Sequence, residues 1–416
     1  MASLDRAELL INQGKIDLAV EQLKGVLLED PDNAYALTYL ALCKLRLNDA
    51  NDAIHTAKMA LASNPEIDFA LYVISAAHLK LENFNKSENA IKKAIEINPN
   101  SADYYGLQAQ LKLISKDFKV AIELAQKGLQ IDAEHLFCRN MLSTAQLKSG
   151  DKEASFQTIH RALEMDPENP LSHANYGWAE LEKGSHKKAL GHFKEALKYD
   201  PHDEYARSGM LEALKAKYVL YRLFLRYYFF MANLKPGTQW ALIIGIVMIN
   251  RILRNGAESI GEYGFLLSYV SYGLIFFMVS TWVIEPVFNF FMRLNTYSKY
   301  LLTPEESKTA LFVGFCFSIF VVSIIGWAIT QSDGFVAGML VGYSLILPVG
   351  RLNMARASWV NWLLILYSSV SATVGGLFIY ASFVSEAGIE NSVLVIYIGL
   401  IVAFSWLWNF VASANK

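Results

Sequence analysis

Five prolines divide the first half of the chain into equal lengths. They are Pro31, Pro65, Pro99, Pro167 and Pro201. The spacing is 34 residues, and Ala133 takes the place of the one missing member. Each proline follows Asp or Asn and an apolar helical pattern, as in "AIEINP". Proline lacks an amide donor and restricts the residue before it, so it marks the end of a helix. The fixed period predicts an all-α array of stacked repeats over residues 1–203.

Small side chains recur at the eighth, twentieth and twenty-seventh positions of the period. Ser75, Ser87 and Gly177 are examples. Small residues allow two helices to approach closely, so we expect paired helices to cross at these points. The pattern resembles the tetratricopeptide repeat, in which two antiparallel helices per repeat stack into a right-handed superhelix. The resemblance implies a solenoid of six repeats.

The resemblance also implies a concave groove, lined by the first helix of each repeat, that binds a peptide or helix of another protein. Aromatic and amide side chains at groove positions offer stacking area and hydrogen bonds. The expected groove residues are Tyr35, Tyr39, Phe69, Tyr72, Asp103, Gln110, Phe137, Asn140, Asn175 and Trp178. Some of them would instead pack between repeats. The basic clamp that holds a carboxyl terminus in some such domains is missing from these positions.

The second half has a different composition. Residues 1–237 hold 60 charged residues, whereas the 179 residues of 238–416 hold only 16. A soluble domain is about one quarter charged, so the second half is expected to be a helical bundle in a membrane. A span needs about 20 apolar residues. The expected spans are 240–253, 263–284, 310–329, 334–349, 359–384 and 392–412.

The positive charges of the loops predict the orientation of these spans. Arg293, Lys299, Lys308 and Arg351 should face the cytoplasm. The N-terminal sequence shows no signal peptide, so the repeat array is also expected there. Both ends then lie on one side, and the number of spans is even. Segment 240–253 must therefore cross, although it carries Arg251.

The stretches "YYFFMANLKPGTQWALIIG" and "STWVIEPVFNFFMRLNTYSKYLLTPEE" are similar to those of bacterial multi-pass membrane proteins with N-terminal tetratricopeptide repeats. The resemblance implies a location in the bacterial inner membrane and no particular activity.

Residues 204–237 join the two halves. We expect a capping helix followed by a basic, aromatic helix, "KYVLYRLFLRYYFFMANLKPG", on the membrane surface. Arg222 and Arg226 share a helix face suited to lipid phosphates, and Trp240 is a typical interface residue.

Few residues in or directly beside the predicted spans could carry chemistry. Glu285 and Pro286 are candidates, because a carboxylate in a span is costly and proline frees a backbone carbonyl; a structural or interfacial role is favoured. Gly334, Gly338 and Gly342 form a GxxxGxxxG face for close helix packing, with a narrow pore as the alternative. We expect no metal or cofactor, since no Cys/His ligand spacing occurs.

The leading functional hypothesis is a membrane-anchored scaffold or assembly factor that recruits a cytoplasmic protein or peptide. The alternative is a transporter or channel subunit regulated by the array; a polar row lining a cavity among the spans would favour it. An enzyme is not expected, because no catalytic motif occurs. The net charge of −2 gives no reason to expect nucleic acid as a partner.

Overall fold

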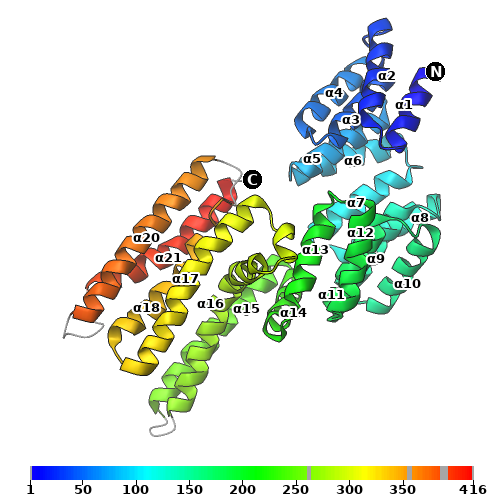
Figure 1. Cartoon of the computed structure of the whole chain (residues 1–416). Helices are drawn as coiled ribbons and strands as arrows, with labels where there is room; N and C mark the ends of the chain where they lie inside the picture. Colours follow the sequence, from blue (N-terminus) through cyan, green and yellow to red (C-terminus); the bar gives the residue numbers. More distant parts are fainter. Residues whose placement is uncertain (1, 260–263, 354–357, 385–391, 415–416) are drawn as a thin grey trace. The chain divides into compact units, whose positions relative to one another are not determined.

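The computed structural model describes residues 2–259, 264–353, 358–384 and 392–414, and those ranges contain helices but no strand (Figure 1). The all-α fold class expected from the sequence is therefore confirmed for this part of the chain. Two compact units make it up. The first is Met1–Lys183 with Gly191–Asp203, and the second is Gly184–Leu190 with Glu204–Lys416.

Pairs of helices follow one another along the first unit. They are α1 (Ala2–Asn12) and α2 (Ile16–Glu29), α3 (Ala34–Arg46) and α4 (Ala50–Ser63), α5 (Asp68–Lys80) and α6 (Phe84–Ile97), α7 (Ala102–Ile114) and α8 (Phe118–Ile131), α9 (Leu136–Ser149) and α10 (Lys152–Met165), and α11 (Pro170–Lys183) and α12 (His186–Tyr199). From α3 onward, the first helix of each pair begins 34 residues after the previous one. The sequence period is thus the period of the helix pairs.

Each repeat ends in a turn that an Asp or Asn side chain stabilises. Asn64 accepts a hydrogen bond from the backbone N–H of Glu66 at 3.1 Å. The donor lies two residues on, as in an Asx-turn, in which an Asp or Asn side chain accepts from the N–H of the second residue after it. Asp132 makes the same bond with the N–H of Glu134 at 2.9 Å, although Ala133 stands at the proline position. The Asp or Asn can therefore hold the turn without the proline, which explains how the register continues through this repeat.

Small residues lie where paired helices cross. Ser75 of α5 and Ser87 of α6 are buried, and each hydroxyl donates to the other residue's carbonyl oxygen, at 2.8 and 2.7 Å. In the sixth repeat, a Cβ added to Gly177 would lie 2.7 Å from the ring of Phe193. Larger side chains would force the helices apart.

Ion pairs join consecutive repeats. Glu88 of α6 pairs with Lys112 of α7 at 2.7 Å, and Lys148 of α9 pairs with Glu182 of α11 at 2.7 Å. Hydrogen bonds from Lys112 and then Lys92 lower the pKa of Glu88. The side chain of Glu88 is 28% exposed, so solvent weakens its ion pairs.

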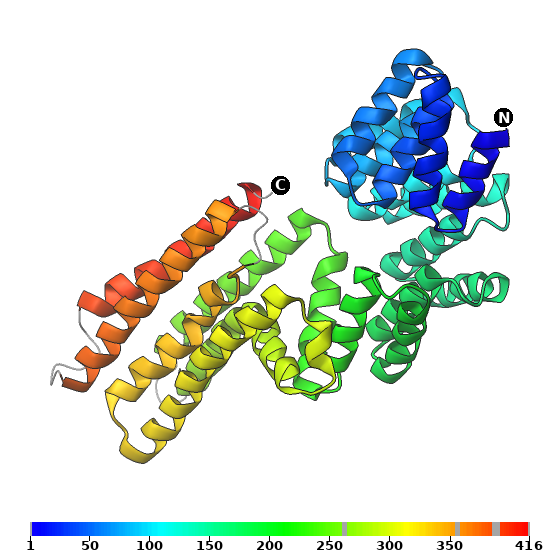
Figure 2. The same cartoon turned by 45° about the horizontal axis from the view of Figure 1, so that its top comes forward.

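The second unit contains the remaining helices. They are α13 (Glu204–Lys215), α14 (Val219–Asn233), α15 (Pro236–Ser259), α16 (Gly264–Leu294), the 3-10 helix η2 (Ser298–Leu301), α17 (Pro304–Thr330), α18 (Asp333–Ser344), α19 (Ile346–Val349), α20 (Ser358–Val384) and α21 (Ser392–Ala414). Helices α20 and α21 lie side by side (Figure 2).

Four helices of this unit are long and apolar enough to cross a membrane. By length and composition these are Pro236–Ala257, Gly264–Leu294, Pro304–Thr330 and Trp359–Val384. Asp333–Val349 and, within the described side chains, Ser392–Phe404 are shorter apolar helices. Helix α16 continues ten residues beyond the apolar segment that ends at residue 284. Polar residues can continue a helix, because helical hydrogen bonds join backbone groups whatever the hydropathy of the side chains.

Three glycines of α18 allow it to pack closely against α17 and α20. A Cβ on Gly338 would lie 2.3 Å from Ser323 Oγ, and one on Gly342 would lie 2.6 Å from the backbone nitrogen of Phe320, both in α17. A Cβ on Gly334 would instead lie 2.4 Å from the Phe383 ring of α20. All three glycines therefore lie at close helix contacts.

Hydroxyl groups join the helices of this unit. Ser280 of α16 and Tyr343 of α18 are 2.5 Å apart, and Ser344 of α18 and Tyr397 of α21 are 2.7 Å apart. Thr309 of α17 donates to the carbonyl oxygen of Leu352 at 2.7 Å. Such bonds pair hydroxyl groups that the helix contacts bury in whole or in part.

Candidate functional site

Four aromatic rings form a continuous row on the first helices of three consecutive repeats. We call this row the aromatic ladder; it consists of Tyr39, Phe69, Tyr72 and Tyr104. Successive ring centroids are 5.8, 5.7 and 5.4 Å apart, and the last three rings are stacked. Tyr39, Phe69 and Tyr72 are half-buried, whereas Tyr104 is buried. The ladder is thus a supported apolar surface that still offers ring area to a partner.

Carboxylates bind both ends of the ladder. The Tyr39 hydroxyl donates to Glu8 at 2.9 Å, and the Tyr104 hydroxyl donates to Asp68 at 2.9 Å. Asp68 also accepts a hydrogen bond from Asn98 at 2.8 Å. Burial and then Glu8 raise the pKa of Tyr39 to about 12, and burial and then Asp68 raise the pKa of Tyr104 further. The rings are therefore neutral at physiological pH, and negative charge lies along their edge.

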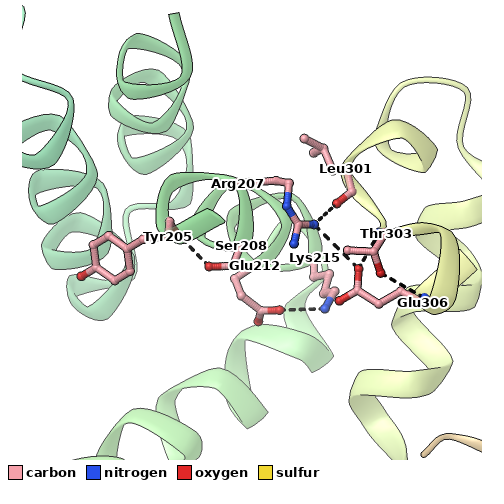
Figure 3. Close-up of polar contacts among 8 residues, drawn as sticks. All are labelled: Tyr205, Arg207, Ser208, Glu212, Lys215, Leu301, Thr303 and Glu306. Atoms are coloured by element: carbon pink, nitrogen blue, oxygen red, sulfur yellow. Dashed lines mark hydrogen bonds and ion pairs between the residues drawn. The ribbon is translucent and has the colours of Figure 1, made fainter. Parts of the chain in front are cut away.

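A second polar cluster ties α13 to the start of α17 (Figure 3). The guanidinium of Arg207 donates to the carbonyl oxygen of Leu301 and lies 3.7 Å from the Glu306 carboxylate. Glu306 also completes a capping box: its carboxylate accepts from the Thr303 N–H at 2.7 Å, and its own N–H donates to the Thr303 hydroxyl at 3.1 Å. One carboxylate thus caps α17 and anchors α13.

A buried lysine lies at the end of α13. Lys215 is 1% exposed and pairs with Glu212 at 2.7 Å (Figure 3). Glu212 also accepts a hydrogen bond from the Tyr221 hydroxyl at 2.5 Å. Beside it, Leu211 packs with Met292 and Leu302 in a small apolar core. The start of α14 and the end of α13 are therefore held to each other and to the end of α16.

The basic, aromatic stretch forms α14, which packs on α16 through rings. Tyr221 lies 4.7 Å from Phe288, and Phe224 lies 5.4 Å from Phe277, between ring centroids. Arg222 is half-buried, and Arg226 is exposed. Trp240, near the start of α15, is 62% exposed.

The side chains of Glu285 and Pro286 lie in different surroundings. Glu285 is exposed, while Pro286 is buried within continuous α16 and packs on Gly350, where a Cβ would lie 2.8 Å from its ring. A small pocket beside Pro286 is lined by Asn289, Glu306, Thr309, Ala310, Val313 and Gly350. The carboxylate at this pocket is therefore that of Glu306, which the sequence analysis did not single out.

Family models for the tetratricopeptide repeat match residues 10–73, 70–101 and 140–204. The first half of the chain is built of tetratricopeptide repeats. No curated protein matches the chain.

Several solved structures resemble part of the chain at low identity. One is a tetratricopeptide repeat protein from Parabacteroides merdae, with 16% identity and a TM-score of 0.44, covering 51% of this chain and 83% of that one. PilF of Pseudomonas aeruginosa has 15% identity and a TM-score of 0.39, with 50% and 94% covered. YrrB, a TPR protein with an unusual peptide-binding site, has 16% identity and a TM-score of 0.32, with 45% and 96% covered.

The other predicted groove residues of the tetratricopeptide array lie in varied surroundings. Tyr35 is 59% exposed, and Gln110 is half-buried. Asp103 is exposed and pairs with His135 at 3.3 Å, raising the pKa of that imidazole. Phe137 packs over Gly106, where a Cβ would lie 2.6 Å from its ring.

Three predicted groove residues pack between helices of the repeat array. Trp178 is half-buried and meets the buried ring of Phe193 edge-on at 5.6 Å. Asn140 and Asn175 are 1% and 5% exposed. Their amides bond each other at 3.3 Å, and Asn140 donates to Ser172 at 3.0 Å. Buried amides paired in this way hold repeats together, so we leave them out of the binding surface.

Sequence reasoning missed Tyr104. It lies at the third position of its helix, which is not a groove position in the tetratricopeptide pattern. Its ring reaches back one repeat to Tyr72 and Asp68. Two adjacent tyrosines, Tyr104 and Tyr105, were the only available signal.

Proposed function

We propose that this chain is a membrane-anchored scaffold that recruits another protein or peptide through the aromatic ladder. The observation that carries the proposal is the continuity of the ladder over three repeats. Tetratricopeptide repeats are protein-interaction modules, and a row of supported aromatic rings is the kind of surface on which binding energy concentrates.

The anchor in this proposal is the second unit. Four long apolar helices support it, since together they expose more apolar side chains than a soluble protein tolerates. We place the repeats in the cytoplasm, at the inner membrane of a bacterium. The support is the distribution of charge: Arg293, Lys299 and Lys308 lie in or beside the connection between α16 and α17, and positive loops remain inside.

The surroundings of the ladder favour a partner segment with apolar and basic side chains. The rings provide stacking area for aliphatic groups and for guanidinium planes. Glu8 and Asp68 accept hydrogen bonds from ring hydroxyls. The negative charge of Asp103 acts on Tyr72 and Tyr104, with Arg46 opposing it at Tyr72. A segment rich in Asp or Glu would meet like charge there and bind more weakly.

The test replaces three ladder rings in the full chain, as Tyr39→Ala, Phe69→Ala and Tyr72→Ala together. Proteins that cross-link to the repeats of the wild-type chain in cells should be lost from this variant. The matched control is Phe84→Ala, because Phe84 is a 40% exposed ring on the second helix of its repeat. Circular dichroism checks that both variants remain helical. An unchanged set of cross-linked partners in a folded triple variant would reject the ladder as the binding surface.

A further inference from the structure

The face of α14 that points away from α16 is apolar and has no cover within the described part of its unit. Val219, Leu223 and Phe230 are 72%, 58% and 56% exposed. At about 100° per residue these three side chains lie within roughly 40° of one another around the helix. They are opposite Tyr221 and Leu225, which are buried. Helix α14 therefore has two apolar faces, of which only one packs on protein.

Positive charge gathers on one flank of that exposed face. Arg222 and Arg226 are four residues apart and lie on the same side. The turn before α12 approaches them: a Cβ on Gly184 would lie 3.5 Å from the Arg226 guanidinium. Exposed Lys187 follows as the second residue of α12. Burial, and then the charges of Arg222 and Lys187, lower the pKa of His186 between them. The carboxylates near α14, Glu212 and Glu285, act on Tyr221, which lies on the packed face.

The contacts with α16 fix the level of α14 along that helix. The rings of α14 touch Phe277 and Phe288. Helix α16 carries no charged residue from Gly264 to Ile284, and Glu285 and Arg293 follow. Phe288 lies three residues after Glu285 and Phe277 eight residues before it, so α14 extends across the level at which α16 changes from uncharged to charged. In a spanning helix this change marks the headgroup region of the bilayer.

We propose that the outer face of α14 lies in the headgroup region of an anionic bilayer. Val219, Leu223 and Phe230 enter the interface, while Arg222 and Arg226 bind lipid phosphates. Burial at the bilayer centre is disfavoured, because both arginines would be placed in hydrocarbon. The inference rests on the membrane location given in the proposed function and is independent of recruitment by the ladder.

The first experiment measures the depth of residue 223. The full chain with Leu223→Cys carries a fluorescent thiol label; Cys43, Cys138 and Cys316 are buried and should not react. It is reconstituted in nanodiscs of equal phosphatidylcholine and phosphatidylglycerol. We expect nitroxide on the lipid headgroup to quench the label more strongly than nitroxide at mid-chain or iodide in the water.

Three results would overturn the inference. Strongest quenching by the mid-chain nitroxide would make α14 a span, and quenching by iodide alone would place it in water. Protection from all three quenchers would mean that protein, such as a second copy of the chain, covers the face.

The second experiment tests the arginines. Native mass spectrometry of the detergent-solubilised full chain compares retention of phosphatidylglycerol with that of phosphatidylcholine. Arg222→Gln with Arg226→Gln should lower the anionic preference up to about 30-fold, since each charge contributes about 1 kcal/mol and 1.4 kcal/mol is tenfold. Lys24→Gln with Lys127→Gln removes two exposed charges from the repeats as the matched control. Equal preferences in both double variants would overturn phosphate binding by the arginines.

The outcome separates this inference from the proposed function. If alkaline carbonate releases the chain from membranes, the membrane anchor itself is wrong. If the chain stays in the membrane while the label at residue 223 is not at headgroup depth, only the position of α14 is wrong.

Discussion

Two glycines of the sixth repeat should respond in opposite ways to the same substitution. Gly177→Ala would place a methyl group 2.7 Å from the fully buried Phe193 ring, and overpacking of this kind costs about 1–3 kcal/mol. Gly191 lies within α12, and a Cβ there would have no neighbour within 4 Å. Gly191→Ala should therefore stabilise the helix by about 0.5–1 kcal/mol. Hydrogen exchange of the α11 and α12 amides measures both; destabilisation by both substitutions would contradict this account of the crossing.

The ion pair between Glu88 and Lys112 should make the contact of α6 with α7 sensitive to pH. The lowered pKa of Glu88 means that its stabilising effect is complete above 4.5, the unperturbed value, and is lost as the pH falls through the folded-state value. Glu88→Gln should reduce amide protection in α7 slightly at neutral pH, by about 0.5 kcal/mol after solvent screening. The difference from wild type should vanish in acid. Glu96→Gln, an exposed change in the same helix, is the control; a difference from wild type that persists in acid would rule out the ion pair as its cause.

The period predicted where each repeat ends, but a position in the period did not predict which side chains meet between repeats. The Asp or Asn before each proline position forms its turn bond with an N–H two residues away, within the motif itself. Asn140 and Asn175 occupy groove positions by number, yet their amides turn to each other across a repeat boundary. The position of a residue in the period predicts only approximately which face of the helix its side chain lies on. A small rotation of the helix about its axis decides whether that side chain lines the groove or lies in the core.

At the scale of the helix, the Glu–Lys pairs of α12 and α13 offer a matched comparison. Lys215 and Glu212 are three residues apart and largely buried, at 1% and 20% exposure, whereas Lys198 and Glu195 have the same spacing at 60% and 42%. Glu212→Gln leaves a buried ammonium without its carboxylate and should cost about 1–3 kcal/mol. Hydrogen exchange in α13 should rise accordingly, and Glu195→Gln should have no measurable effect in α12. Equal effects of the two substitutions would mean that burial does not decide the strength of the pair.

The repeat period predicted helix boundaries more closely than hydropathy did. The period placed the repeats, and α13 begins at the next step of it, at residue 204. Helix α16 runs ten residues past its apolar segment, and α15 begins at Pro236 and continues through Arg251 to Ser259. Hydropathy reports where a helix can meet lipid, while hydrogen bonding and capping decide where it stops, so the two boundaries differ.

For the whole molecule, reporter fusions distinguish four crossings from six. With four, α18–α19 and α21 do not cross, and a reporter after Asn353 lies on the side opposite the repeats. With six, that reporter lies on the same side as the repeats. We expect six, because Arg351 favours the cytoplasmic side. Fusions after residues 203 and 416 should read alike in both cases, and opposite readings there would exclude any even number of spans.

The composition of the two halves predicted an apolar helical region after the repeats but not how its helices meet. Nothing in the hydropathy of α17 indicates that Glu306 contacts Arg207, because the contact joins polar ends of helices distant in the chain. The choice of Glu285 as the notable carboxylate followed from its neighbour Pro286, and in the structure that proline lies beside the pocket that Glu306 lines instead. Contacts of this kind require the folded arrangement.

The contacts of Arg207 with Leu301 and Glu306 can form only after a delay during synthesis of the chain. Arg207 leaves the ribosome 99 residues ahead of Glu306. At about 5–20 residues per second this is a delay of roughly 5–20 s. All six repeats are synthesised before the partners of Arg207 in α13 exist. Helices α15 and α16 also precede Leu301 and Glu306 in the chain, so they are made before those partners. These contacts can therefore form only after α15 and α16 have been made. A chain in which these two helices fail to insert would carry six complete repeats while Arg207 lacks its partners.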